Sequence, residues 1–280
     1  MKKIILIIFI FIVLFPLVIL FLPRKEKINV YFHRENVVKT MALEKYLQGV
    51  LSAEMSEGFH IEALKAQAVA ARTYTIAKMN GSLHKGGADI CTDSAHCQAY
   101  NENYVKNSKI EKAVKDTKGE VATYGGVPIR AVFHSASCGF TENSKDVWGG
   151  ELPYLKSVES DDSLCPDYIT TATFKKDELM DLIGTDTLSW EITRSESGRV
   201  KEITFGGHTF KGTEIRNRLN LRSTCFDIEE KDENIIFTVK GYGHGVGMSQ
   251  WGAEAMARDG KGYKKILKHY YKNIKIEKTR

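Results

Sequence analysis

The chain has 280 residues, of which 42% are hydrophobic and 27% are charged, and its formal net charge is +5. This composition is typical of a globular protein with enough apolar residues for a sizeable core, and it excludes wholesale disorder. Most of the positive charge lies at the N-terminus, in Lys2, Lys3, Arg24, Lys25 and Lys27. The rest of the chain is nearly neutral, which argues against nucleic-acid binding because that function needs a basic face to neutralise phosphates.

Residues 4–22 form an apolar run without a charged side chain. The run is close to the length that spans a hydrocarbon core of roughly 30 Å, and no small-residue cleavage site of a signal peptide follows it. We therefore expect a cytoplasmic tail at 1–3, a transmembrane signal anchor at 4–22 and a linker at 23–29. Residues 30–280 are expected to form the extracytoplasmic part of a single-pass protein of the cell membrane. Basic residues on both flanks do not settle the orientation in the membrane. The short N-terminal tail favours the one that places residues 30–280 outside the cytoplasm.

The next stretch, 40–78, predicts two helices separated by a break near Gly58. The first has apolar residues at the spacing of one helical face, and the second, from Ile61, is rich in alanine, so that another backbone can approach it closely. Glu54 lies just before the break. A carboxyl group at a helix C-terminus faces the negative end of the macrodipole, which favours its neutral form and suits a general acid. The alternative is an ordinary solvated glutamate.

The elements expected after these helices are helices segregated from antiparallel hairpins, with an insertion at about 171–226. A strand at 30–40 precedes the helical pair, and a helix at 110–117, a hairpin at 121–134 and a loop at 135–162 follow it. The insertion is expected to contain a helix at 175–183, hairpin strands at 189–192 and 200–205, and a helix at 213–219 capped by Thr213. After it come a strand at 235–239, a helix capped by Ser249 and ending near Arg258, a helix at 263–271 and a basic tail. The predicted class is α+β: a helical catalytic core packed with antiparallel hairpins, a smaller α/β insertion, a substrate cleft between them, and the N-terminal transmembrane helix.

Two of the five cysteines, Cys91 and Cys97, lie close together near His84 and His96. Two thiolates and one imidazole can hold Zn²⁺ with water or another side chain as the fourth ligand. The spacing is not that of a standard zinc finger. A local disulfide or free thiols therefore stay open as alternatives.

Small polar residues follow the predicted strand at 121–134, in the loop from His134 to Cys138. Cys138 could be a nucleophile with His134 or His244 as its base, or the loop hydroxyls could simply cap their own backbone. The glycine run at 241–247 lacks the Gly-Lys-Ser/Thr ending of a phosphate loop. Trp148, Tyr242 and Trp251 lie near glycines, where they could stack on sugar faces or belong to the core.

Five stretches together resemble one family, the stage II sporulation protein D family, whose domain is shared with amidase-enhancer proteins of cell-wall turnover. The stretches are EKYLQGVLSAEM, EALKAQAVAARTY, ADICTDSAHCQAY, FHSASCG and GYGHGVGMSQWGAEAMA. They occur in the family's order from about residue 30 to the C-terminus. The resemblance implies a lytic transglycosylase that cleaves the β-1,4 bond between N-acetylmuramic acid and N-acetylglucosamine in glycan strands stripped of stem peptides, forming 1,6-anhydro ends. A glycan-binding enhancer of a partner amidase is the alternative.

The resemblance also assigns residues. The family's catalytic glutamate corresponds to Glu54, acting first as acid and then as base, with a pKa near about 6 reached by partial burial. A structural zinc ion would be held by His84, Cys91 and Cys97, with His96 as a substitute because one extra residue separates His84 from Cys91. The expected substrate-binding residues are Gln67, Arg72, Tyr74, His134, Ser135, Ser137, Tyr242, His244, Gln250 and Trp251.

The expected partners follow from the resemblance as well. They are peptidoglycan glycan strands and the stage II sporulation proteins M and P, a membrane scaffold and an amidase/endopeptidase. The implied setting is engulfment, in the mother-cell membrane facing the forespore.

Overall fold

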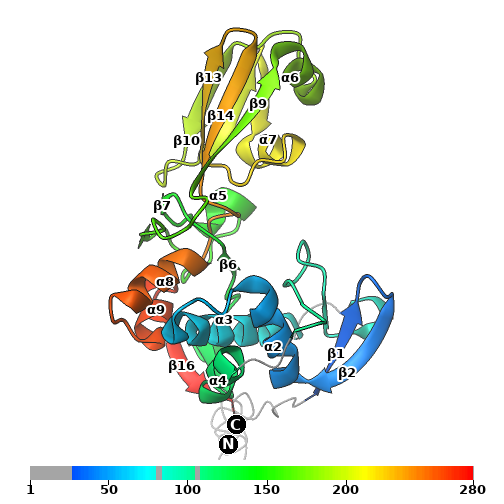
Figure 1. Ribbon diagram of the computed structural model, residues 1–280, viewed down its shortest axis with the longest axis vertical. Coiled ribbons are helices and arrows are strands. Elements are labelled where there is room, and N and C mark those ends of the chain that lie inside the picture. The colour runs from blue at the N-terminus through cyan, green and yellow to red at the C-terminus, as the bar shows by residue number, and fades with distance from the viewer. Residues whose placement is uncertain (1–26, 80–83, 105–107, 280) are drawn as a thin grey trace, which may run out of the picture.

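The computed structural model describes residues 27–79, 84–104 and 108–279 (Figure 1). The helices of this part are α2 (Leu43–Glu54), α3 (Ile61–Met79), α4 (Ser108–Asp116), α5 (Ser144–Trp148), α6 (Lys176–Ile183), α7 (Gly212–Arg218), α8 (Gln250–Arg258), α9 (Tyr263–Tyr270) and the 3₁₀ turn η1 (Lys85–Gly87). The strands are β1 (Lys27–Phe32), β2 (Val37–Ala42), β3 (Ile90–Cys91), β4 (Glu120–Tyr124), β5 (Val127–Pro128), β6 (Phe133–His134), β7 (Gly139–Phe140), β8 (Glu159–Ser160), β9 (Ile169–Lys175), β10 (Trp190–Arg194), β11 (Val200–Phe205), β12 (His208–Lys211), β13 (Phe226–Lys231), β14 (Asn234–Lys240), β15 (Met248–Ser249) and β16 (Lys275–Lys278).

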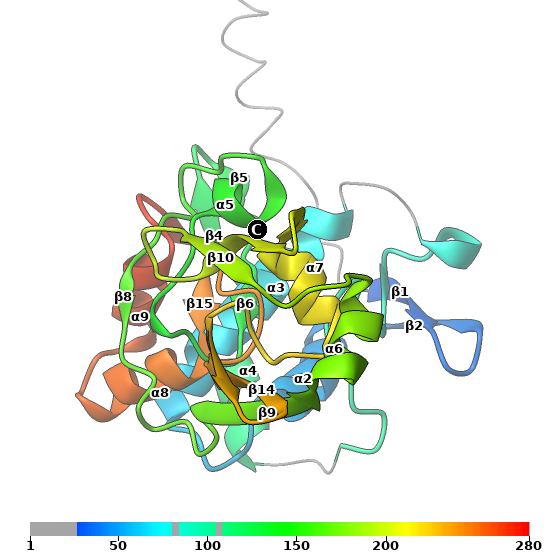
Figure 2. The same cartoon turned by 90° about the horizontal axis from the view of Figure 1, so that it is seen from above.

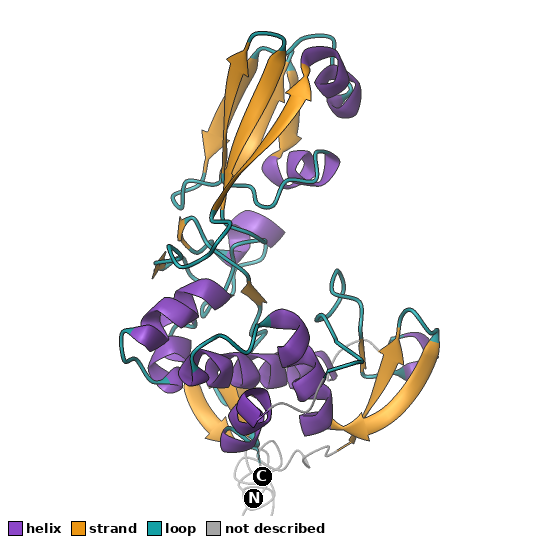
Figure 3. Ribbon diagram, in the orientation of Figure 1, coloured by secondary structure: helices purple, strands orange, loops and turns teal. Residues whose placement is uncertain are grey.

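The molecule is elongated, with a helical part at one end and a sheet-rich part at the other (Figures 1 and 3). Helices α2, α3, α4, α8 and α9 gather in the lower part, and strands β9, β13 and β14 with α6 and α7 form the upper part. Most strand pairs are antiparallel, whereas β1–β3 and β6–β15 are parallel. The predicted α+β class is confirmed.

The alanine-rich helix α3 is the centre of the lower part. It is buried along most of its length, and α2, α4, α8, α9 and β4 all pack against it. Small alanine side chains permit this, because they let several neighbouring backbones approach one helix from different sides. The core around it joins aliphatic residues of α2, such as Leu47 and Val50, to Ile266 and Leu267 of α9. Viewed from above, α3 lies near the centre, between α2 on one side and α8 and α9 on the other (Figure 2).

The upper part has a separate hydrophobic core, which includes Ile203, Phe205, Phe226 and Phe237. Its three-stranded sheet has the order β13-β14-β9, and the pairing of β14 with β9 runs from Asn234↔Lys175 to Lys240↔Ile169. The second sheet, β10-β11-β12, contains the hairpin expected from 189–192 and 200–205. The upper part is therefore larger than the insertion expected at 171–226, because β9 begins before that range and β13 and β14 extend beyond it.

Several elements differ from the sequence expectation. Residues 30–40 form not one strand but a hairpin of β1 and β2, because Asn36 takes the left-handed conformation (φ 56°) that asparagine tolerates in a turn. Helix α2 ends at Glu54 instead of Gly58, since Met55 is already extended. The cap of α7 is Lys211, without a side-chain hydrogen bond, and not Thr213. The basic tail is strand β16, paired with β4.

The expected location in the cell membrane is contradicted by the structure. In the described ranges no helix is both long and apolar enough to cross a membrane. Helix α3 has 19 residues, but Lys65, Arg72 and Lys78 interrupt it and it is enclosed by other helices. The tail at 1–3 and the anchor predicted at 4–22 lie outside the described residues. Residues 27–29, assigned to the linker, begin strand β1.

Candidate functional site

Glu54 is the last residue of α2, and its carboxylate accepts hydrogen bonds from two distant parts of the chain. Oε1 accepts from the backbone N–H of Ala99 at 2.8 Å, and Oε2 accepts from Nε2 of Gln250 at 3.2 Å. Gln250 is the first residue of α8, whose N-cap Ser249 accepts a hydrogen bond from the N–H of Gly252. Two donors therefore fix the orientation of one carboxyl group.

The Ala99 donor is held in place by close packing on α2. Tyr100 stacks on Tyr46 with ring centroids 5.5 Å apart, and the N–H of Asn101 donates to the carbonyl of Gly49. A Cβ at Gly49 would lie 2.3 Å from the Tyr100 ring, so only glycine permits this contact. The segment before Tyr100 is thereby pressed against the end of α2 that carries Glu54.

Burial raises the pKa of Glu54 above its ordinary value, and the hydrogen bonds from Ala99 and Gln250 oppose that effect. Desolvation disfavours the charged carboxylate, whereas donors to it favour the charge. The net upward direction keeps a larger fraction of the group protonated near neutral pH. This is the electrostatic setting of a general acid.

Glu54 opens into a cavity of about 670 Å³. All the residues that line the cavity fall between 53 and 148 or within 242–244. Of the described residues none from 171–226 lines it, which corrects the expected cleft between core and insertion. The physical reason is that the insertion lies with the upper part, beyond α5 and β7 (Figure 1). Lys78 and Arg130 also face the cavity, and Glu54 is the only acidic residue among those that line it in the described structure.

Aromatic and imidazole rings form one wall of the cavity. Trp148 is 45% exposed and Tyr242 is 46% exposed, and the Trp148 ring lies 5.2 Å from that of His244. His134 is buried, its Nε2 bonded to Ser137 Oγ at 2.8 Å, and burial lowers its pKa well below the ordinary value. Burial, with the positive charges of Arg199 and Arg216, lowers the pKa of His244 to about 4. Both rings are therefore neutral at pH 7.

Beside this wall, His84, Cys91, His96 and Cys97 form a compact group. Their ligand atoms all lie within 4.8 Å of one another. His84 Nε2 is 3.1 Å from Cys97 Sγ, and His96 Nδ1 is 3.3 Å from Cys91 Sγ. A tetrahedral zinc site with the usual metal–ligand bonds has ligand atoms roughly 3.3 to 3.8 Å apart. Two thiols and two imidazoles at these distances fit a metal ion. Both candidate histidines belong to the group, so His96 is a fourth potential ligand and not a substitute for His84.

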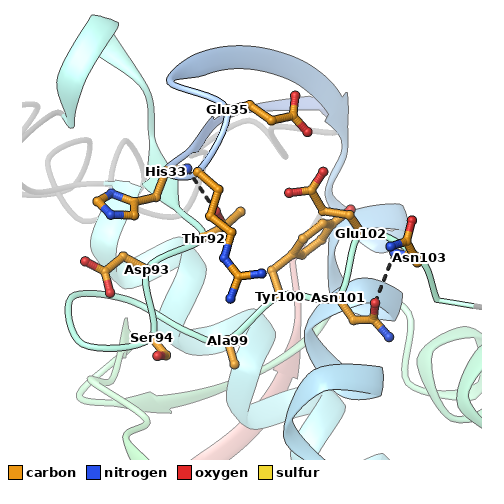
Figure 4. A pocket seen from close by; sticks show the side chains of 11 residues that line it. His33, Glu35, Thr92, Asp93, Ser94, Ala99, Tyr100, Asn101, Glu102 and Asn103 are labelled. Carbon is orange, nitrogen blue, oxygen red and sulfur yellow. Dashed lines mark hydrogen bonds between the residues drawn. The ribbon is translucent and has the colours of Figure 1, made fainter.

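A second cavity of about 570 Å³ shares Ser94 and Ala99 with the Glu54 cavity. Figure 4 shows Glu35 and Glu102 facing each other across it. Both are exposed, and a hydrogen bond to Glu35 raises the pKa of Glu102. Neither carboxyl group lines the Glu54 cavity, so they do not provide it with a second acid.

Comparison with known proteins identifies the family. A family model described as SpoIID, stage II sporulation protein, matches residues 31–124. Stage II sporulation protein D of Bacillus amyloliquefaciens is 38% identical over 271 residues, covering 90% of this chain and 79% of the relative. The chain belongs to the stage II sporulation protein D family. The same protein of Bacillus subtilis (strain 168) is 37% identical with the same coverage. The amidase enhancer of that strain is 31% identical over 289 residues, which cover 80% of this chain and 39% of the relative.

Family membership connects the chain to sporulation, and the structure shows where its motif residues lie. Tyr74, His134, Ser135, Tyr242 and His244 line the Glu54 cavity. Five other positions expected to bind substrate do not line the cavity. They are Gln67, Arg72, Ser137, Gln250 and Trp251.

Ser137 and Trp251 do not line the cavity themselves but form hydrogen bonds with residues that do. Ser137 is buried and bonds His134, and the backbone N–H of Trp251 donates to the carbonyl of Ser135. The Trp251 ring packs on Phe59 with centroids 4.6 Å apart. These contacts place the cavity wall relative to α8.

Arg72 and Gln67 belong to the core of the helical part. The buried guanidinium of Arg72 pairs with both carboxylate oxygens of Glu44, at 3.0 and 2.7 Å, and also donates to the carbonyls of Glu120 and Val114. Gln67 is fully buried, and its side-chain amide has no hydrogen-bond partner in the described structure. Arg72 thus has its donors occupied within the protein.

The geometry gives no support to a cysteine–histidine pair. In the described residues no hydrogen bond joins Cys138 to His134 or His244; the Cys138 thiol faces the carbonyl of Ser197. Nδ1 of His244 accepts from the N–H of Val246 at 3.0 Å. Neither histidine is therefore placed to act as the general base of a Cys138 nucleophile, as a cysteine peptidase would require.

The sequence interpretation missed three groups at the cavity: Lys78, Arg130 and the Ala99 amide. Lys78 lies in the last turn of α3, one helix beyond the Glu54 motif, and Arg130 follows the hairpin strand β5. Neither position carries a motif. A backbone N–H has no sequence signal at all, so the Ala99 donor could be found only in three dimensions.

Proposed function

We propose that the protein is a lytic transglycosylase acting on peptidoglycan glycan strands during sporulation, with Glu54 as its single general acid and base. The observation that carries the proposal is the environment of Glu54: a partly buried carboxyl group of raised pKa, held by two donors at a cavity of about 670 Å³. Family membership supports the same substrate class, because an amidase enhancer is among the relatives.

The reaction needs a proton on the leaving glycosidic oxygen as the sugar becomes oxocarbenium-like. Glu54 would supply that proton, and its raised pKa increases the fraction of the group that carries one. The resulting carboxylate is stabilised by the N–H of Ala99 and the amide of Gln250. It would then accept a proton from the 6-hydroxyl of N-acetylmuramic acid, which attacks C1 and closes the 1,6-anhydro ring.

A hydrolase of the usual type would need a second carboxylate to activate water or form a covalent intermediate. Intramolecular attack by the 6-hydroxyl dispenses with that group. Of the described residues around the cavity only Glu54 is acidic, and two imidazoles of its lining, His134 and His244, are neutral and hydrogen-bonded. This composition favours transglycosylation over hydrolysis.

Trp148 and Tyr242 would bind the sugar rings. Both expose nearly half of their surface at the cavity, and aromatic faces stack well on the apolar faces of pyranose rings. Lys78 and Arg130 add positive charge to the same cavity. A glycan strand, polar and with apolar ring faces, matches such a lining.

We further propose that the ion held by His84, Cys91, His96 and Cys97 is zinc, in a structural role. Cysteine and histidine ligands in equal number are typical of closed structural zinc sites, and four protein ligands leave no position for a substrate or water. The bound ion would tie together the segment that ends in Ala99. The four residues would thereby help to position the donor to Glu54.

The test is the mass of the products from purified, peptide-free glycan strands. The wild type is expected to release fragments with 1,6-anhydro ends, about 18 Da lighter than hydrolysis products because no water is added. Glu54→Gln is expected to lose this activity, whereas Glu57→Gln, the same change at an exposed position three residues further on, keeps it. Ordinary reducing ends, or an active Glu54→Gln variant, would contradict the proposal.

The similarity to an amidase enhancer favours a second candidate: a protein that binds glycan and stimulates a partner amidase without cleaving anything itself. In that case the protein alone would release no fragments. Addition of the protein would instead accelerate amidase release of stem peptides, and Glu54→Gln would stimulate as well as the wild type. Fragment release by the protein alone would exclude this candidate.

A further inference from the structure

We propose that Cys138 and Cys225 form a disulfide that fastens the upper, sheet-rich part of the molecule to the loop carrying the cavity residues His134 and Ser135. In the structure both are thiols, and both are partly exposed. The proposal does not depend on the chemistry assigned to Glu54. Three cysteines, Cys138, Cys165 and Cys225, have no role in the cavity or the metal cluster, and the proposal pairs two of them.

Backbone contacts place the two residues side by side. Cys138 follows Ser137 in the loop between β6 and β7, and Cys225 immediately precedes β13. The carbonyl of Cys225 accepts from the N–H of Lys240, and a Cβ on the next residue, Gly241, would lie 2.4 Å from the carbonyl oxygen of Ser137. One short stretch, 240–241, is thus in contact with both cysteine neighbourhoods, and each thiol is the largest influence on the pKa of the other.

The connection between the two parts of the molecule passes through this place. Ala136 and Tyr242 exchange backbone hydrogen bonds of 3.0 and 2.8 Å, and the N–H of Gly243 donates to the carbonyl of Arg222. Tyr242 and Gly243 line the Glu54 cavity. A covalent bond between Cys138 and Cys225 would therefore fix the upper part against the loop that forms the cavity wall.

The electrostatics of the pair suit oxidation by thiol–disulfide exchange. The neighbouring side chain of Cys225, aided by the positive charge of Arg199, lowers the pKa of the Cys138 thiol to about 7. The same interaction raises the pKa of Cys225. Cys138 is thus the attacking thiolate and Cys225 the resolving thiol, because the thiolate is the nucleophile in this exchange.

The oxidant is a disulfide, either a small molecule or an oxidoreductase. The Cys138 thiolate attacks one sulfur of that disulfide and expels the other as a thiol, which leaves a mixed disulfide. Cys225 loses its proton, attacks the Cys138 sulfur and expels the second thiol. In sum, the two cysteines lose two electrons and two protons, and the oxidant takes up both as it is reduced to two thiols.

The remaining cysteines are less suited to this bond. Cys91 and Cys97 lie in the group with His84 and His96, in the lower part of the molecule. Cys165 is 6% exposed, and burial raises its pKa, so it is a poor nucleophile. Cys165 therefore provides a matched control in the same region of the fold.

The experiment maps the bond in the full chain. Protein purified without reductant is incubated with oxidised glutathione, free thiols are alkylated, and tryptic peptides are weighed. Cleavage after Arg130, Lys145, Arg222 and Lys231 places the two cysteines on peptides 131–145 and 223–231, whereas Cys165 lies on 157–175. We expect a linked 131–145/223–231 species that disappears after reduction. Complete alkylation of Cys138 and Cys225, or a link from either to 157–175, would overturn the proposal.

A second readout is thermal unfolding of the oxidised protein with and without reductant. Reduction is expected to lower the Tm of the wild type by roughly 5–15 °C, because the disulfide restrains the unfolded chain. Cys165→Ser should show the same fall, whereas Cys138→Ser and Cys225→Ser should show none. An equal fall in the Cys138→Ser variant would refute the assignment. The peptide map of the wild type decides the question even where a variant does not fold.

Discussion

Replacing Gln250 with leucine should raise the pKa of Glu54 further. The amide of Gln250 donates to Oε2 of Glu54 at 3.2 Å, and this bond favours the ionised carboxylate. A hydrogen bond to a charged group contributes about 1.5–3 kcal/mol, and the length here places it at the weaker end. A loss of about 1.5 kcal/mol corresponds to an increase of about one pKa unit, since one unit equals about 1.4 kcal/mol.

The assay is the pH dependence of the release of anhydro products from purified glycan strands. The alkaline limb of kcat/KM reports the group that must be protonated in the free enzyme. If Glu54 is the general acid, Gln250→Leu moves that limb to higher pH by about one unit. Gln67→Leu is the matched control, because it makes the same chemical change in the core, at an amide that has no hydrogen-bond partner in the described structure.

The direction of the shift is what tests the reasoning. An alkaline limb that stays in place, or moves to lower pH, would show that the amide of Gln250 does not stabilise the ionised form of the catalytic acid. A limb that moves equally in Gln67→Leu would show a general effect of core substitution. Either result would refute the assignment of Glu54 and Gln250 as an interacting pair.

Three further predictions concern stability and metal binding. Glu44→Gln should lower the free energy of unfolding in urea by about 3 kcal/mol, because it leaves the buried Arg72 guanidinium without its countercharge. An unchanged midpoint would contradict the ion pair. Ser249→Ala should cost about 1 kcal/mol in the same assay, through loss of the α8 cap on the N–H of Gly252. Elemental analysis should find one zinc per chain in the wild type and none in Cys97→Ser, and chelation should lower Tm only in the wild type.

The local elements of the helical part were predictable from sequence. The apolar spacing of Leu43, Leu47 and Val50 set the buried face of α2, and Ser249, within the last motif, is the N-cap of α8 as predicted. The position of Glu54 at the end of a helix also followed from local signals. These features depend on residues within one or two turns of one another, and such information is fully contained in a short window of sequence.

The pairings between distant segments were not predictable in this way. Strand β9 was not predicted, yet it pairs with the edge of β14 that β13 leaves open. Its side chains alternate between exposed and partly buried positions, as in a strand with one solvated face. The basic tail became β16 for a similar reason, by pairing with β4 across more than half of the chain. Arg72 was expected to contact substrate, but it is neutralised by Glu44 in the preceding helix. A polar residue in a motif can contact substrate or form an ion pair in the core, and only its contacts in the folded protein distinguish these two roles.

The acidity of Glu54 is itself a property of distant contacts. The helix terminus alone predicts only a mild preference for the neutral form. Packing of segment 92–103 on Gly49 brings the amide of Ala99 to one carboxylate oxygen, and the parallel pairing of β15 with β6 brings Gln250 to the other. These same segments remove water from the carboxyl group, so burial and hydrogen bonding arise together and act in opposite directions on its pKa. The residue type and its place on the helix identify the candidate acid, whereas its strength depends on how closely three separate parts of the chain are packed.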